Sequence, residues 1–222
     1  FDIDYDTERL IMDIGLATKT KINAENTLII FDEIQECPRA LTSLKYFREN
    51  APQYDIIVAG SLLGVACHEG TGFPVGKVSF MNLFPLSFEE FLLAMGEERF
   101  VELLNKKDFK TIKLFNNKYE KLLKQYCYVG GMPEIVQDFV ENKDFESVRN
   151  LQKEIISAYE EDFTKHIPAN TVAKIRLLWK SIPAQLSKEN KKFIYGAAKE
   201  GARARDFEAA LSWLINSGLV YR

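Results

Sequence analysis

A short run of large apolar residues that ends in two acidic residues is the feature that most constrains the fold of this chain. The run is Leu28-Ile29-Ile30-Phe31, and Asp32-Glu33 follow it directly. Because the apolar residues do not alternate with polar ones, the run predicts a strand buried on both faces of a parallel sheet. The two carboxylates are then expected at the carboxyl edge of that sheet, where open α/β sheets bind their ligands.

Nucleotide hydrolases that place acids at this edge also need a loop that cradles phosphate. No Gly-x-x-x-x-Gly-Lys-Ser/Thr pattern occurs in the 222 residues. In the nearest match, which runs from Gly70 to Lys77, the first glycine comes one residue too early and Val78 replaces the hydroxyl residue. The match also leads into an apolar run that predicts a strand, whereas a phosphate cradle leads into a helix. We therefore expect a glycine-containing loop here and no nucleotide cradle.

The composition favours an ordinary soluble globular protein. Hydrophobic residues make up 46% of the chain and charged residues 27%, which suits one large domain or two small ones. The formal charge of -3 gives no global field for nucleic acid or for an anionic membrane, so any such binding must rest on a local patch. Three widely spaced cysteines fit reduced thiols, and no apolar stretch is long enough to cross a membrane. The expected location is the cytoplasm.

The pattern of the chain changes twice along its length. In residues 1–95, helix signals at 7–18 and 39–50 alternate with strand signals at 28–31, 56–59 and 78–83, as in a doubly wound sheet. Ser87 and Glu90 form a capping box that starts the next helix. Residues 96–168 predict charged, amphipathic helices in a lid-like subdomain. Residues 169–222 predict an incomplete winged-helix-like region, with a turn at Pro183 and a strand at Leu219-Val220-Tyr221.

Four motifs, in this order, resemble a prokaryotic family of AAA+ ATPases. They are residues 27–38 around the Asp-Glu pair, Ala59-Gly60-Ser61, residues 84–91, and Gly130-Gly131-Met132-Pro133-Glu134. Segments 201–205 and 210–220 resemble the winged-helix segment that follows the ATPase core in that family. The resemblance implies an α/β fold with a partial parallel-sheet core, then a helical lid-like region and a winged-helix-like region. It identifies the chain as the middle of such a protein, between the Walker A segment and a domain of uncertain function.

The same resemblance implies roles for several residues. Asp32 holds the water shell of Mg²⁺, and Glu33, in the Walker B position, orients or deprotonates the water that attacks ATP. Ser61 corresponds to the sensor that reads the terminal phosphate, and Gln35 relays the state of the site. Lys77 stands where relatives often carry an arginine directed at a neighbouring subunit, although lysine lacks the planar fork of arginine. The implied function is ATP hydrolysis coupled to conformational change in a self-associating protein, with ATP and Mg²⁺ as cofactors and this chain alone inactive.

The residues leave other interpretations open. An Asp-Glu pair after an apolar run also occurs as a simple polar strand exit, Ser61 also suits a turn, and Lys77 also suits a solvated loop. The basic cluster near the C-terminal helix includes Arg203 and Arg205. These two arginines suggest contact with nucleic acid, because arginines at the start of such a helix can reach phosphates or guanine edges. Asp206 in the same turn weakens that hint. The alternative function is a nucleic-acid or protein interaction module with a vestigial nucleotide site.

Overall fold

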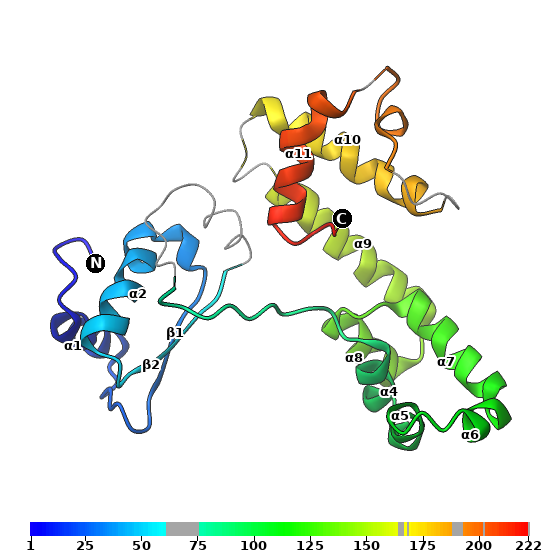
Figure 1. Ribbon diagram of the computed structural model, residues 1–222, viewed down its shortest axis with the longest axis horizontal. Coiled ribbons are helices and arrows are strands. Elements are labelled where there is room, and N and C mark those ends of the chain that lie inside the picture. Colours follow the sequence, from blue (N-terminus) through cyan, green and yellow to red (C-terminus); the bar gives the residue numbers. More distant parts are fainter. Residues whose placement is uncertain (61–75, 164–166, 168, 188–192, 202, 222) are drawn as a thin grey trace. The chain divides into compact units, whose positions relative to one another are not determined.

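The computed structural model describes residues 1–60, 76–163, 167, 169–187, 193–201 and 203–221. The chain divides into two compact units, one formed by residues 1–80 with 168–222 and the other by residues 81–167. The second unit begins before the boundary that the sequence suggested at residue 95. It therefore includes the helix that starts at Ser87, which the sequence grouped with the strands (Figure 1).

The first unit contains a small parallel sheet. Strand β1 (Leu28–Phe31) pairs with β2 (Asp55–Val58) in a register that places Leu28 opposite Asp55. Helix α2 (Pro38–Asn50) connects the two strands, and helix α1 (Thr7–Thr18) precedes β1. A parallel pair needs such a crossover helix. The α/β class predicted for this region is confirmed, in a chain that is mostly helical elsewhere.

Helices α1 and α2 cover one face of this sheet (Figure 1). On that face Ile29 packs in a cluster with Leu10, Ile11, Phe47 and Ala51. The residues that point to the other face are exposed, at 49% for Leu28, 62% for Ile30 and 48% for Ile57. The prediction that β1 is buried on both faces is therefore wrong. Among the described residues, only the face of the sheet toward α1 and α2 is buried.

The segment from Gly76 to Ser87 corrects a second expectation. Residues 78–83 form no strand, although their apolar character predicted one. A strand needs a partner whose N–H and C=O groups it can pair with. Met81 and Leu83 are 88% and 100% exposed. The apolar character of this segment is therefore not sufficient to pair it with a strand. The segment continues into the helical unit (Figure 1).

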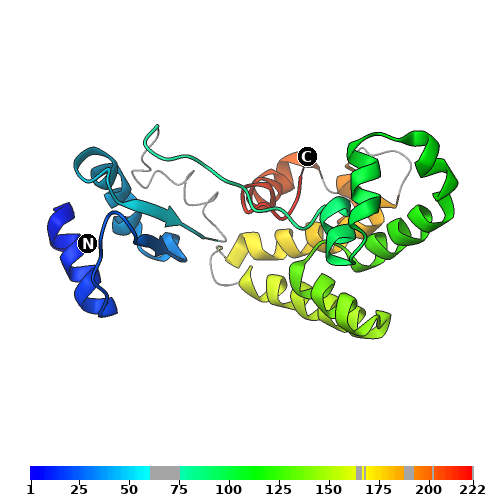
Figure 2. The ribbon, with the colours of Figure 1, turned by 90° about the horizontal axis from the view of Figure 1, so that it is seen from below.

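Residues 81–167 form a helical unit, where the sequence predicted helices over residues 96–168. Its helices are α4 (Phe88–Ala94), α5 (Glu98–Asn105), α6 (Phe109–Leu114), α7 (Asn116–Val129), α8 (Pro133–Asn142) and α9 (Phe145–Asp162). The single helix expected from Phe109 to Cys127 is two helices, which meet at Phe115. Helices α8 and α9 pack side by side (Figure 2). The main core cluster consists of Phe91, Val129, Ile135, Val136, Phe139 and Val148.

A close backbone contact anchors the chain where it enters α4. The N–H of Leu86 donates to the carbonyl of Gly131 at 2.7 Å, and the hydroxyl of Tyr126 donates to the carbonyl of Leu86 at 2.8 Å. A Cβ atom on Gly131 would lie 2.2 Å from the Leu86 carbonyl oxygen. Only glycine permits this approach, which gives the Gly-Gly-Met-Pro motif a packing role.

The C-terminal part consists of α10 (Ala169–Leu186), the short 3₁₀ helix η2 (Tyr195–Ala197) and α11 (Ala204–Asn216). Helix α10 continues through Pro183, where the sequence predicted a turn. Residues 219–221 form no strand, so the wing expected there is not formed. Helices α10 and α11 pack against each other, with Ile175, Leu178 and Leu214 each at most 1% exposed. None of the helices in the described ranges combines the length and apolar character that a membrane crossing requires.

Candidate functional site

Two backbone hydrogen bonds fix the place where Asp32 and Glu33 leave the sheet. The N–H of Ala59 donates to the carbonyl of Phe31 at 2.8 Å, and the N–H of Ile34 donates to the carbonyl of Ala59 at 3.1 Å. These bonds hold the chain on both sides of the Asp-Glu pair against the end of β2. Both acids therefore lie at the carboxyl edge of the parallel pair, and both are exposed to solvent.

Glu33 has an unusual backbone conformation. It lies in the left-handed region, with φ 48° and ψ 43°, and precedes the 3₁₀ helix η1 (Ile34–Glu36). For a residue with a Cβ atom this region costs roughly 1–2 kcal/mol. Such strain is kept where the surrounding structure imposes it, and it is frequent at active sites. The Oδ1 atom of Asp32 accepts a hydrogen bond from the N–H of Glu33 at 3.0 Å, which helps to hold this turn.

The side chain of Gln35 is directed at the acid pair. Its Nε2 atom donates a hydrogen bond to Oε2 of Glu33. Its Oε1 atom is buried and has no hydrogen-bond partner among the described residues. A buried acceptor without a partner costs about 1–3 kcal/mol, so this oxygen is an unfavourable feature of the loop as the structure describes it.

The groups at this edge are oxygen ligands. The carboxylates of Asp32 and Glu33 and the amide of Gln35 suit a hard cation such as Mg²⁺, which keeps several water ligands and is often shared with substrate phosphates. Across the described ranges no group of three or more His, Cys, Asp or Glu side chains is arranged to hold a metal ion.

Of the other residues suggested for nucleotide chemistry, the structure describes Lys77 but not Ser61. Ser61, like most of the loop from Gly70 to Lys77, lies outside the described residues. The Nζ atom of Lys77 lies 3.3 Å from Oε1 of Glu49, in the last turn of α2. That turn is roughly 16 Å along the helix from its first residue, which follows η1. Lys77 therefore forms its ion pair with Glu49, at the end of α2 away from the Asp-Glu pair.

Arg203 and Arg205 lie at the start of α11, as the sequence suggested. The N–H of Arg203 donates to Oδ2 of Asp206 at 3.1 Å, and Nε of Arg205 lies 3.9 Å from Oδ1 of the same residue. The carboxylate of Asp206 therefore reduces the positive potential at this helix end. Lys191 and Lys192, which belong to the same basic cluster in the sequence, lie outside the described residues.

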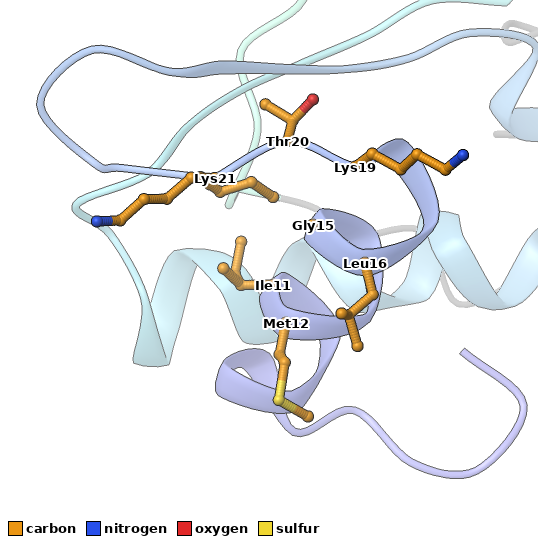
Figure 3. Close-up of a pocket in the computed structure, with 8 residues that line it drawn as sticks. Ile11, Met12, Gly15, Leu16, Lys19, Thr20 and Lys21 are labelled. Carbon is orange, nitrogen blue, oxygen red and sulfur yellow. The ribbon is translucent and has the colours of Figure 1, made fainter.

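A shallow groove of about 480 Å³ lies beside the C-terminal half of α1. Figure 3 shows the side chains of Met12 and Leu16 along α1, with Lys19 and Lys21 extending in opposite directions from the chain after the helix. Gly15 allows that chain to fold back, because a Cβ atom there would lie 3.0 Å from the carbonyl oxygen of Thr20. Asp32 and Glu33 do not line this groove, so it is separate from the acid pair.

Two protein-family models match separate parts of the chain. Residues 2–92 match the model of an AAA domain, and residues 120–222 match the model of a domain of unknown function. The first match includes Asp32, Glu33 and Lys77, and it supports an AAA-like, nucleotide-binding P-loop NTPase domain. The second includes Arg203 and Arg205. The searches of curated proteins and of solved structures found no match.

Proposed function

We propose that this chain is part of an ATP-binding and ATP-hydrolysing AAA+ protein that couples nucleotide turnover to conformational change. The observation that carries the proposal is the acid pair at the carboxyl edge of a parallel strand–helix–strand unit, within the region that matches an AAA domain. The strained backbone of Glu33 and its hydrogen bond from Gln35 support a catalytic role over a simple strand exit.

Each residue of the pair has a distinct role in this proposal. Asp32 would hold Mg²⁺ through the water ligands of the ion, which supplies charge neutralisation for the phosphates when bound. Glu33 accepts a proton from, or orients, the attacking water. Gln35 is a positioning residue, because its amide fixes the direction of the Glu33 carboxylate. Ser61, which follows the end of β2, is the proposed phosphate sensor.

The phosphate cradle is proposed to come from a segment outside these 222 residues, since no Walker A pattern occurs within them. The exposed apolar face at Leu28, Ile30 and Ile57 supports this, because the sheet of a nucleotide-binding α/β domain is covered on both faces. We propose that the chain alone binds ATP weakly and is inactive. Helices α4–α9 are the proposed lid-like region, and the complete protein is expected to self-associate.

A substitution of Glu33 tests this function in the protein that includes the phosphate-binding segment. Glu33→Gln removes the proton acceptor and keeps the size of the side chain. We expect the rate of Mg²⁺-dependent ATP hydrolysis to fall by about 10²–10⁴-fold, with the affinity for ATP nearly unchanged. Hydrolysis is measured by phosphate release, and affinity by titration with a fluorescent ATP analogue.

Glu25→Gln is the matched control, because Glu25 is an exposed acid in the turn before β1. Its hydrolysis rate should equal that of the unmodified protein. Unchanged hydrolysis in Glu33→Gln would contradict the role of Glu33. If the unmodified protein neither bound nor hydrolysed ATP, the nucleotide site would be vestigial and the interaction-module alternative would stand.

A further inference from the structure

Positive charge is concentrated in one stretch of the helical unit. Seven lysines and two acidic residues lie between Lys106 and Lys124, in a chain with a formal charge of -3. The stretch extends from the end of α5 through α6 and most of α7. A local basic surface of this kind can attract a polyanion even where the net charge of the chain is negative.

A groove of about 760 Å³ lies on the exposed side of α7. It is lined by Asn117, Glu120, Lys121, Lys124, Gln125 and Tyr128 from α7 and by Phe145 from the start of α9. The α7 residues recur three and four positions apart, which places them on one side of the helix. Tyr119, Leu122 and Val129 are buried on the other side. We call this surface the α7 groove.

Two aromatic rings form one end of the α7 groove. The rings of Tyr128 and Phe145 meet edge to face, with centroids 5.1 Å apart, and the two residues are 48% and 42% exposed. Phe145 also contacts Phe139 of the core, with centroids 5.0 Å apart. The side chain of Gln152 donates to the carbonyl of Tyr128 at 2.7 Å. The rings are therefore held by the helical unit while much of their surface faces solvent.

The lysines of the groove are available for an anion. Lys121 and Lys124 are exposed and form no ion pair with any residue that the structure describes. Lys118, on another side of α7, instead lies 2.7 Å from Glu97. Glu120, the acid of the groove, accepts a hydrogen bond from Asn116 at 2.6 Å. Positive charge thus lies next to exposed aromatic surface.

We propose that the α7 groove binds single-stranded nucleic acid. Bases stack on Tyr128 and Phe145, and Lys121 and Lys124 pair with the phosphates. Aromatic rings beside lysines are the combination with which proteins bind single strands, because every base offers a face for stacking. A duplex hides these faces within its own stack. The amides of Asn117 and Gln125 can reach base edges. This binding goes beyond the proposed ATPase activity and does not depend on bound ATP.

The structure favours this surface over the start of α11. At α11, Asp206 lies next to both Arg203 and Arg205 and reduces their charge. An acidic peptide is the other polyanion that the lysines would attract. An acidic peptide would gain less binding free energy from the exposed rings, since a carboxylate has no aromatic face that can stack on them as a base does.

Fluorescence anisotropy with a labelled oligothymidylate, and with a duplex of the same length, tests the proposal on the 222-residue chain. We expect tighter binding of the single strand, with an affinity that falls between about 50 and 200 mM salt. Tyr128→Ala should weaken binding about ten-fold or more through lost stacking. Tyr128→Phe, which keeps the ring, should bind like the unmodified chain. Lys121→Ala with Lys124→Ala should reduce the salt dependence by about 1.4 in logarithmic slope.

Arg203→Ala with Arg205→Ala is the matched control and should leave binding unchanged. Loss of binding in that control, with normal binding in the α7 variants, would overturn the proposal. Equal affinity for the duplex, unchanged affinity in Tyr128→Ala, or no binding of the oligonucleotide would also overturn it. Competition by polyglutamate as effective as that by the oligonucleotide would assign the groove to acidic peptides instead. Circular dichroism of each variant checks that its helices are intact.

Discussion

Glu33 joins a proposed catalytic role to a strained backbone. Its carboxylate is proposed to act on water, yet its φ of 48° suits glycine or asparagine better than glutamate. The hydrogen bonds of Asp32 and Gln35 to Glu33 hold this conformation. The proposed function and local stability would then make opposite demands at this position.

Replacing Glu33 by glycine and by alanine measures this strain. Both substitutions remove the carboxylate, but only alanine keeps a Cβ atom in the left-handed region. We expect the glycine variant to be more stable than the alanine variant by about 0.5–1 kcal/mol, because relief of strain exceeds the added freedom of glycine in the unfolded chain. Hydrogen exchange of the amides in β1 and η1 reports the local opening free energy. Equal stability of the two variants would show that the turn is relaxed.

At this scale the sequence predicted the location of the acids but not their surroundings. An apolar run that ends at Asp32 is a local pattern, so the carboxyl edge could be predicted from it. The left-handed turn at Glu33 and the burial of the Oε1 atom of Gln35 depend on the loop as a whole and leave no local signal. The ion pair of Lys77 with Glu49 joins two segments that no motif connects.

Hydrogen bonds in the first turn of helix α4 determine where this helix begins. The N–H of Ser87 donates to Oε2 of Glu90 at 2.7 Å, and the N–H of Glu90 donates to the Ser87 hydroxyl at 3.3 Å. The sequence predicted this capping box because both partners lie within four residues. The hydrogen bonds from the backbone and the side chain of Ser87 hold the pKa of Glu90 below its ordinary value.

The cap of α4 is expected to depend on pH. Because the pKa of Glu90 is lower in the folded state, ionised Glu90 stabilises the fold above its unfolded pKa of about 4.3, and this stabilisation is lost as the pH falls through the folded value. Ser87→Ala should lower the free energy of unfolding by about 1 kcal/mol at neutral pH. Urea unfolding at pH 7 and pH 3 should show a smaller loss at pH 3. Glu90→Gln should be less sensitive to acid, and an equal sensitivity would contradict this account.

Other elements departed from local expectation because of tertiary contacts. Pro183 usually ends a helix, but α10 continues past it. Gln185 exchanges hydrogen bonds with the backbone of Ile194, at 2.7 and 3.1 Å, and so ties the last turn of α10 to the chain before η2. Leu178 and Ser181 are also buried. The Gln185–Ile194 hydrogen bonds join residues nine positions apart, beyond the spacing of contacts within a helix, so the propensity of proline alone could not predict the end of this helix.

On the scale of the whole molecule, the sequence pattern changes from strands to helices near residue 95, whereas the helical unit of the structure begins at residue 81. The capping box at Ser87 looked like part of the α/β region, yet Phe91 is fully buried in the core of the helical unit. The hydrogen bond between Leu86 and Gly131 fixes the start of that unit. Such a boundary depends on which core a side chain enters, and neither composition nor periodicity contains that information.

Residues 79–87, just before α4, present large apolar side chains on an extended backbone that belongs to no helix or strand (Figure 1). Proteases bind their substrates as extended chains, and several prefer residues of this kind. We expect brief treatment with chymotrypsin to cut first near Phe80, Leu83 and Phe84, which are 65%, 100% and 58% exposed. Leu123 of α7, at 46%, is an internal control, because its helical backbone should resist cleavage. Mass spectrometry of the fragments identifies the first cut.

A first cut within α7 would contradict this expectation. A cut near Leu83 would release Asp32 and Glu33 on a peptide that contains β1 and β2, and would leave α4–α11 in one chain. The rate of cleavage in this short segment would then determine how long Asp32 and Glu33 stay covalently joined to the lysine-rich helices α6 and α7 in the presence of proteases.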